Sequence, residues 1–154
     1  MDIAQLLARE SVRDLVARYN AAGDSGRFDE VVDLFWPDAT MVLGRGDDAV
    51  VKAGHDEIRS IFTGAAQRWA TDGTSVGAAP LDGVTTAHYV RHRVSTLVID
   101  VDGNQATAYC YFAVIMAHGL DHWGRYFDRF EARDGVWKFI SRKVVSEGNQ
   151  TVGG

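Results

Sequence analysis

Cysteine is nearly absent from this sequence, and its scarcity excludes several classes of protein. The chain has 154 residues and a single cysteine, Cys110, so neither an internal disulfide nor a multi-cysteine metal site can form. A chain without disulfides fits a reducing compartment, and we therefore expect a cytoplasmic location.

Long apolar runs and an excess of positive charge are also missing. No stretch approaches the roughly 18–20 apolar residues of a membrane span. The N-terminus lacks the basic region and apolar run of a secretory signal. The formal net charge of −5 and the isoelectric point near 5.4 argue against nucleic acid, since a phosphate binder needs a basic surface. We therefore expect no membrane and no nucleic-acid partner.

What the sequence does contain is the composition of one ordinary globular domain. Hydrophobic residues make up 46% of the chain and charged residues 24%, which excludes disordered, collagen-like and coiled-coil chains. The length is that of one compact domain. We expect a single domain over residues 1–147 and a frayed tail over residues 148–154.

The first half of the chain has the apolar spacing of helices. Steps of three and four residues predict a first helix, which begins with a capping box of Asp2 and Gln5 and ends near Gly23. Further elements are expected in chain order: a helix over 28–35, strands over 39–43 and 49–52, and a helix starting near Gly54.

The second half has the pattern of long antiparallel strands. Asp102-Gly103 and Asp134-Gly135 predict two hairpin turns between alternating segments. A loop over 71–83 precedes them and is expected to gate a site. The four strands are expected over residues 84–100, 105–118, 123–133 and 136–146. Helices followed by a long antiparallel sheet predict an α+β fold with the helices packed on one face.

Side-chain parity predicts which strand residues face the helices, because successive residues point to opposite sides of a sheet. His88 and His92 share the apolar face of the first long strand. A two-residue turn would place the odd residues of the next strand beside them, and a three-residue loop with Gly103 left-handed would place the even ones there. The longer loop is favoured because the even residues of that strand are more apolar than the odd ones. These even residues are Cys110, Phe112, Val114 and Met116.

The second hairpin fits a two-residue turn. Tyr126, Asp128 and Phe130 then face inward. Arg142 is expected on the opposite, mostly charged face.

Two inward histidines are the strongest sign of chemistry. One alone is usually a satisfied core residue, but two on one face indicate a site, since neutral imidazole accepts a proton near pH 7. Such a base needs a carboxylate to fix its tautomer, and Asp24, just after the glycine that ends the first helix, is the leading candidate. Asp24 could instead be a turn residue or the N-cap of the second helix.

A second group of titratable residues lies between two predicted strands. His118 and His122, with Asp121 between them, could form a metal site. A four-residue spacing has no helical meaning in a strand, and no third ligand can be placed. We expect no metal and no organic cofactor.

Motifs along nearly the whole chain resemble the SnoaL-like branch of the nuclear-transport-factor-2-like superfamily. Their order and spacing carry the resemblance, and they comprise Val12 to Tyr19, Asp24 to Asp29, Leu34 to Ala39, Gly54 to Ile58, Thr86-Ala87-His88-Tyr89, Gly124 to Phe130 and Asp134 to Phe139. The fold hosts many chemistries, so it indicates architecture more strongly than function.

Within that superfamily the chain is most similar to scytalone dehydratases, bile-acid dehydratases and hexachlorocyclohexane dehydrochlorinases. The resemblance implies a catalytic pair of Asp24 and His88, which removes a proton while a leaving group departs. It also implies that Tyr19 and Tyr126 line the pocket. The first-strand tyrosine of the dehydratases falls on Leu43 here.

These observations predict a cone: a strongly curved antiparallel sheet wrapped around three N-terminal helices. The pocket suits a small, mostly apolar cyclic molecule. Its expected lining is Tyr19, Trp36, His88, Val90, His92, Phe112, Met116, Tyr126 and Phe130.

The expected activity is that of a cofactor-independent lyase, dehydratase-like or dehydrohalogenase-like, acting through the histidine–aspartate pair. An isomerase or a polyketide-type cyclase would need the same residues. A non-catalytic pocket or accessory protein is the alternative from another class, because small subunits of ring-hydroxylating dioxygenases share the fold. An outer sheet face with Tyr89, Leu97, Ile99 and Phe127 predicts a homo-oligomer, and the resemblance favours a trimer over a dimer.

Overall fold

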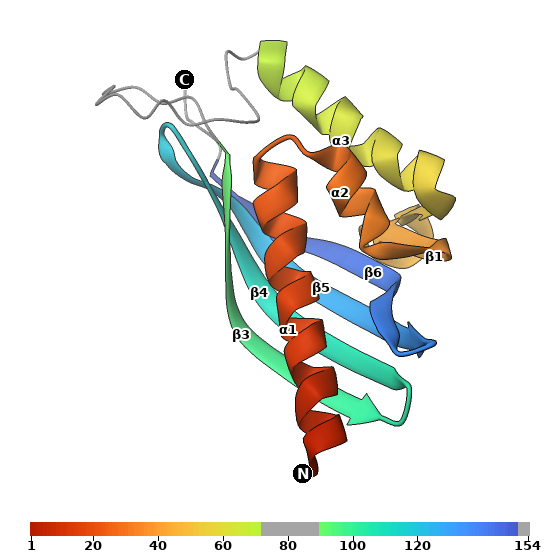
Figure 1. Cartoon of the computed structure of the whole chain (residues 1–154). Coiled ribbons are helices and arrows are strands. Elements are labelled where there is room, and N and C mark those ends of the chain that lie inside the picture. Colours follow the sequence, from red (N-terminus) through yellow and green to blue (C-terminus); the bar gives the residue numbers. More distant parts are fainter. Residues whose placement is uncertain (72–89, 151–154) are drawn as a thin grey trace.

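The computed structural model describes residues 1–71 and 90–150, which form helices and a single β-sheet (Figure 1). His88 and residues 72–83 of the predicted loop lie outside the described residues. The elements are α1 (Ile3–Asp24), α2 (Phe28–Asp33), β1 (Phe35–Leu43), the 3₁₀ turn η1 (Gly46–Asp48), β2 (Val50–Ala53), α3 (Gly54–Thr71), β3 (Arg91–Asp102), β4 (Gln105–Met116), β5 (Gly119–Arg133) and β6 (Val136–Asn149). The predicted α+β class is confirmed. β6 reaches two residues into the predicted tail.

The sheet is curved and open, and α1 lies along its concave face (Figure 1). Its strand order is β2-β1-β6-β5-β4-β3. Neighbouring strands are antiparallel except that β1 runs parallel to β6. The sheet is therefore mixed, where the sequence predicted a wholly antiparallel one. None of the helices in the described ranges is both long and apolar enough to cross a membrane.

The first helix begins as predicted and ends slightly later. The Asp2 carboxylate accepts from the backbone N–H of Gln5 at 2.8 Å, and the Gln5 side chain accepts from the Asp2 N–H at 3.1 Å, so the capping box is confirmed. The helix continues through Gly23 to Asp24, and Gly26 takes the left-handed conformation (φ 72°) that turns the chain. Asp24 is thereby held at the end of a rigid element.

The segment after α2 differs from its prediction. The sequence predicted a helix to residue 35 and a strand from residue 39, but β1 already begins at Phe35 and includes Pro37. The pairing of β1 with β6 shifts between Phe35 and Thr40. Proline lacks the N–H that a ladder needs, so a strand accommodates it where pairing is interrupted.

In the hairpin of β3 and β4, the even residues of β4 lie beside His92 as predicted, but a bulge rather than a longer turn sets this register. The turn has two residues, since Asp102 pairs with Gln105, so the expected three-residue loop is wrong, although Gly103 is left-handed (φ 59°). An irregularity between Ser95 and Val98 shifts the register. β4 presents its even residues to the interior along its length, and Cys110, Phe112 and Val114 are buried beside the inward residues of β3.

That irregularity also reverses which residues of β3 face inward. Thr96 sits within it at φ 54°, and a bulge moves all following side chains to the other face. Ile99 is therefore only 2% exposed, and Val98 is 39% exposed. The prediction that Ile99 lies on the outer face is wrong, and Leu97 packs against the core.

A second bulge corrects the prediction for Arg142. The turn at Asp134 (φ 50°) and Gly135 (φ 79°) has two residues, as predicted. The register then shifts: Phe130 pairs with Phe139, but Arg129 pairs with Ser141. The extra residue, Ile140, places Arg142 opposite Asp128 in the interior, where its side chain is fully buried.

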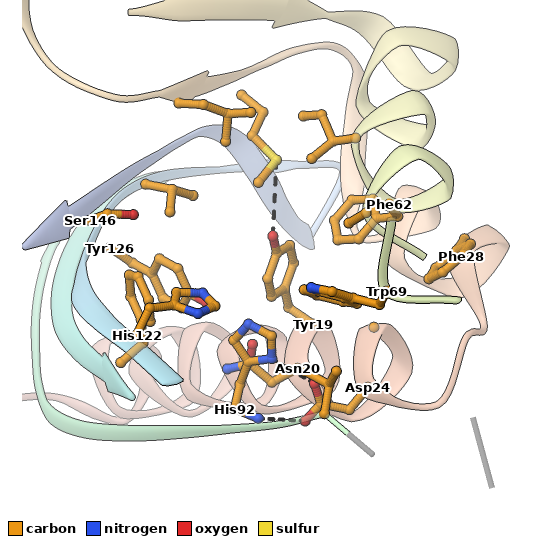
Figure 2. Close-up of a pocket in the computed structure, with 18 residues that line it drawn as sticks. Tyr19, Asn20, Asp24, Phe28, Phe62, Trp69, His92, His122, Tyr126 and Ser146 are labelled. Carbon is orange, nitrogen blue, oxygen red and sulfur yellow. Dashed lines mark hydrogen bonds and ion pairs between the residues drawn. The ribbon is translucent and has the colours of Figure 1, made fainter. Parts of the chain in front are cut away.

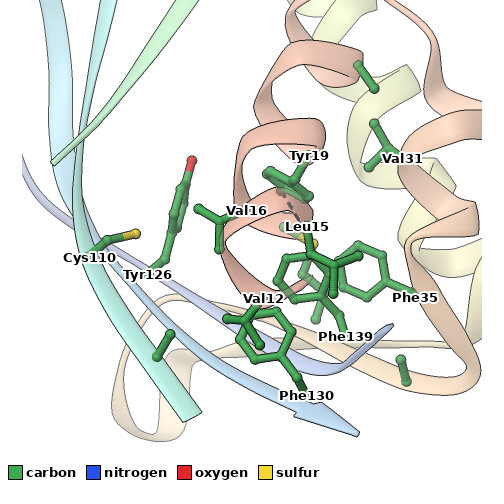
Figure 3. Packing of buried hydrophobic residues seen from close by; sticks show 14 of the residues in the cluster. Val12, Leu15, Val16, Tyr19, Val31, Phe35, Cys110, Tyr126, Phe130 and Phe139 are labelled. Carbon is green, nitrogen blue, oxygen red and sulfur yellow. Dashed lines mark hydrogen bonds between the residues drawn. The ribbon is translucent and has the colours of Figure 1, made fainter. Parts of the chain in front are cut away.

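The core contains a cluster of phenylalanine rings that α1 covers (Figure 3). Phe139 packs on Phe35 and Phe130 with ring centroids 4.8 and 4.6 Å apart. Val12 and Val16 of α1 are buried against this cluster. The concave face is thus solidly packed at one end, which leaves room for a cavity at the other.

Candidate functional site

A cavity of about 150 Å³ lies between α1, α3 and the concave face of the sheet (Figure 2). Its walls are mainly apolar and aromatic, with polar groups on a few side chains. The lining residues are Tyr19, Asn20, Gly23, Asp24, Phe28, Met41, Leu43, Ile61, Phe62, Ala65, Trp69, Val90, His92, Phe112, His122, Tyr126, Val144 and Ser146.

Asp24 and His92 form a close pair on one wall of the cavity. Oδ1 of Asp24 lies 2.6 Å from Nδ1 of His92, and Oδ2 accepts from the His92 backbone N–H at 2.8 Å. The side chains are 9% and 20% exposed, respectively. An ionised carboxylate only accepts, so Nδ1 carries the proton and Nε2, on the opposite edge of the ring, is the acceptor that faces the cavity (Figure 2).

This pairing arises because the end of α1 meets the start of β3. Arg91 also donates from Nη1 to the Asp24 carbonyl oxygen at 3.5 Å. The alternative role for Asp24, capping the second helix, is excluded, because the N-cap of α2 is Arg27 and has no side-chain cap. The carboxylate is directed across to the sheet.

The predicted pocket residues divide into three groups. Tyr19, Val90, Phe112 and Tyr126 line the cavity together with the pair described above. His88, the predicted base, lies outside the described residues, so its contact with Asp24 stays a prediction. Trp36, Met116 and Phe130 are not brought to this cavity.

Trp36 and Phe130 belong to the packed end of the sheet. The indole Nε1 of Trp36 donates to the Glu131 carbonyl at 2.9 Å, and the Arg133 guanidinium lies 4.7 Å above the ring. Phe130 is 1% exposed inside the cluster of phenylalanine rings. Met116 packs against the core at the end of β4. Inward parity was right for Phe130, but parity does not say how far along the cone a residue lies.

Two tyrosine side chains, Tyr19 and Tyr126, line the cavity. Burial raises the pKa of Tyr19 to about 12, although Arg142 opposes the shift. Burial, followed by the neighbouring Tyr19, raises the pKa of Tyr126 well above its ordinary value. Both phenols are therefore protonated at neutral pH. The Tyr19 hydroxyl lies 4.0 Å from Sδ of Met41 (Figure 2), a weak partner that a ligand oxygen could replace.

A buried ion pair of Arg142 and Asp128 contacts the rings of these two tyrosines. Nε and Nη2 of Arg142 donate to the two oxygens of Asp128 at 2.8 and 2.7 Å. The guanidinium carbon lies 3.9 Å from the Tyr19 ring centroid and 4.1 Å from that of Tyr126, so the cation fixes both rings. Burial raises the pKa of Asp128 against the opposing effect of Arg142. Burial disfavours charge on Arg142 too, but Asp128 outweighs it and raises that pKa.

His122 is the functional candidate that sequence reasoning placed in a different role. It lines the cavity from β5, and its Nδ1 lies 2.6 Å from Oδ2 of Asp121. His118 contacts the other oxygen of that carboxylate at 3.0 Å. Within residues 1–71 and 90–150, no group of three or more His, Cys, Asp or Glu side chains could hold a metal ion. The same even parity that predicted Tyr126 to face inward also applies to His122.

Comparison with known proteins identifies the family and the fold. The family model of the SnoaL-like domain matches residues 4–143. No curated protein matches the chain.

Solved structures with low sequence identity share the fold. The hexachlorocyclohexane dehydrochlorinase LinA-type3 from Novosphingobium barchaimii LL02 is 16% identical, with a TM-score of 0.75 over 100% of this chain and 96% of that one. A candidate scytalone dehydratase from Novosphingobium aromaticivorans DSM 12444 is 18% identical, with a TM-score of 0.71 over 99% and 94%.

The fold also serves proteins of another kind. The β subunit of a candidate aromatic-ring-hydroxylating dioxygenase from Novosphingobium aromaticivorans DSM 12444 is 20% identical, with a TM-score of 0.70 over 97% of this chain and 94% of that one. The family match covers most of the sequence, and the structures agree with it over the whole domain. The chain therefore belongs to the SnoaL-like domain family, with the nuclear-transport-factor-2-like α+β fold.

Proposed function

We propose that this protein is a cofactor-independent lyase that removes a proton from a small, mostly apolar cyclic molecule and expels a leaving group. One observation carries the proposal: the imidazole of His92, held by Asp24 at 2.6 Å, borders an apolar cavity. A positioned neutral imidazole is a general base suited to neutral pH.

In the proposed reaction each group has one task. Nε2 of His92 accepts the proton, and Asp24 stabilises the imidazolium that forms. Because Asp24 also accepts from the His92 backbone N–H, the base and its partner keep a fixed orientation. The hydroxyls of Tyr19 and Tyr126 stay protonated and can donate to an oxygen on which negative charge develops.

The size of the cavity supports a ring-sized substrate. An apolar cavity of about 150 Å³ is large enough to hold benzene. The few polar groups on its walls suit a molecule with one or two oxygen atoms or halogens.

His88 is the competing base, because the resemblance in sequence assigns that role to it. The two candidates are separated by His92→Asn and His88→Asn, assayed beside Asp24→Asn. We expect His92→Asn and Asp24→Asn each to lose at least ~10²-fold in rate, the usual scale for a general base. A loss confined to His88→Asn would transfer the role of base to that residue.

The reaction type is tested with cyclic ketones, hydroxyketones and halogenated rings incubated in D₂O and followed by NMR. Loss of the leaving group supports a lyase. Deuterium exchange or a shifted double bond without such a loss supports an isomerase, and ring closure of an open-chain substrate supports a polyketide-type cyclase.

An accessory role is the second candidate, favoured by the fold that the chain shares with a dioxygenase β subunit. In that case ligands would bind in the cavity and none would be turned over. Retention of full wild-type activity in both histidine variants would instead show that neither histidine is the base.

A further inference from the structure

We propose that His122, positioned by Asp121, is a second acid–base residue of the same cavity and protonates the departing group. This inference rests on the proposed lyase function and narrows its substrate class. The leaving group would be a hydroxyl, which departs as water, rather than a halide.

The two histidines lie in one row across the sheet. Val114 of β4 pairs with His92 of β3 on one side and with His122 of β5 on the other. Val114 is fully buried on the concave face, and directly paired residues share a face. Neighbouring strands are about 4.8 Å apart, so the two histidine Cα atoms are roughly 10 Å apart.

The ring of Phe112 lies near both imidazoles and sets the space between them. Its centroid is 6.4 Å from that of His92 and 6.1 Å from that of His122. Both histidines line the cavity, and Figure 2 shows their rings on its wall; they come from β3 and β5, the two strands on either side of β4. A ring-shaped ligand in the cavity would contact both imidazoles.

A bulge in β5 brings Asp121 onto His122. Val114 pairs with His122 and Ile115 with Leu120, so Asp121 is the extra, unpaired residue. Adjacent strand residues normally point to opposite faces, but the bulge lets the Asp121 carboxylate reach Nδ1 of its neighbour at 2.6 Å. Its carbonyl oxygen accepts from the Gln150 N–H at 2.7 Å, which ties the bulge to the end of β6.

Asp121 therefore does for His122 what Asp24 does for His92. The carboxylate holds the Nδ1 proton and leaves Nε2 on the cavity side of the ring. Nε2 accepts a proton in the neutral imidazole and donates one in the protonated imidazole. In the proposed reaction the imidazole of His92 accepts a proton and that of His122 gives one.

The reaction balances with these two groups. Nε2 of His92 takes a proton from the carbon next to a carbonyl, and the C–H electron pair becomes the new C=C bond. The C–O bond at the next carbon breaks, and its electron pair takes the proton from Nε2 of His122, so water leaves. Both imidazoles return to their starting states by exchange with solvent. A halide leaves as a stable anion and needs no such proton.

The pH dependence of this step has two limbs. The rate falls at acidic pH because His92 must be neutral, and it falls at alkaline pH because His122 must carry its proton. Among residues 1–71 and 90–150, the charged and titratable groups around His122 are Asp121 and His118 beside it, Arg68 of α3, and Asp24, His92, Tyr19 and Tyr126 of the cavity wall. Ser146 and Asn149 of β6 are uncharged.

The test compares two leaving groups on one ring, 3-hydroxycyclohexanone and 3-chlorocyclohexanone, both of which give cyclohexenone. We expect His122→Asn to lower kcat/KM at least ~10²-fold on the hydroxyl substrate and less than about threefold on the chloride. The same variant should lose the alkaline limb. His92→Asn should lower the rate on both substrates.

Two further variants separate chemistry from structure. His118→Gln breaks the other contact of Asp121 outside the cavity lining and should keep both rates near wild type. Asp121→Asn should shift the alkaline limb, and Asp121→Glu should restore part of the rate. Circular dichroism and thermal unfolding check that each variant folds.

Several outcomes would overturn the proposal without ambiguity. Equal losses on both substrates in His122→Asn indicate a structural role, and wild-type turnover of the chloride alone excludes the acid. Unchanged rates in His92→Asn contradict the assignment of His92 as the base instead.

A titration of ¹⁵N-histidine-labelled protein with cyclohexanol adds a readout that needs no turnover. The alcohol should shift the Nε2 resonance of His122. The absence of a shift at saturating ligand would refute the contact.

Discussion

The buried pair of Asp128 and Arg142 offers the sharpest test of what holds the site together. Both side chains are 0% exposed, and two hydrogen bonds of 2.8 and 2.7 Å join them. Asp128→Asn keeps the size of the side chain but leaves the guanidinium charge buried without a countercharge. Breaking a buried pair in this way costs about 3–5 kcal/mol.

We therefore expect the free energy of unfolding of Asp128→Asn to fall by about 3–5 kcal/mol. For a chain of this length that corresponds to a decrease in Tm of roughly 6–20 °C. The cavity should also change, because the guanidinium lies between the rings of Tyr19 and Tyr126. Urea unfolding followed by circular dichroism measures the first effect, and ligand affinity measures the second.

A double-mutant cycle supplies the control and the refutation. Asp128→Asn combined with Arg142→Gln removes both charges, so the double variant should lose less stability than the sum of the two single variants. Arg133→Gln breaks partly exposed pairs with Asp38 and Glu131, each at 2.9 Å, and should cost no more than about 1 kcal/mol for each pair. A loss below about 1 kcal/mol in Asp128→Asn, or strict additivity, would refute the reasoning.

The remaining predictions concern a close strand approach, alkaline pH and assembly. A Cβ on Gly124 would lie 2.0 Å from a β6 carbonyl oxygen, so Gly124→Ala should lower stability by roughly 1–3 kcal/mol in urea unfolding, whereas Gly64→Ala in α3 should not lower it. The pKa of Tyr19 is raised to about 12, so the folded state keeps its phenol proton at pH values where the unfolded chain loses it. The stability that this difference contributes is complete below pH 10 and is lost as pH rises toward 12. Tyr19→Phe should lessen that decline in alkaline unfolding curves. Light scattering should give a multiple of the 16.9 kDa chain mass, and we expect a trimer rather than a dimer. A monomer at micromolar concentration would contradict an assembly through the exposed face of Val98, Tyr109, Tyr111 and Phe127.

Local features of the fold followed from the sequence because their causes are local. The capping box of Asp2 and Gln5 needs residues only three positions apart. The turn at Asp134-Gly135 needs two residues that tolerate positive φ. Apolar spacing likewise predicted the helices and the long strands, and together these features determined the α+β class.

The partners of the site were less accessible to sequence reasoning. Asp24 was identified as the orienting carboxylate, and it does hold a histidine of the predicted inward face, His92. Parity placed His92, Phe112 and Tyr126 correctly on the concave side. It could not separate the cavity end from the packed end, so Phe130 was assigned to the wrong environment.

The positions of the β-bulges were decided only by the tertiary structure. Each adds one residue to one strand, which turns every later side chain to the opposite face. Such shifts bury Ile99, bring Arg142 onto Asp128, and seat Asp121 beside His122. Where a bulge forms depends on the residues of the paired strand and on the helix that covers the face, far away along the chain. The sequence by itself determined the elements and their hydrophobic faces, and long-range packing decided which charged groups meet inside.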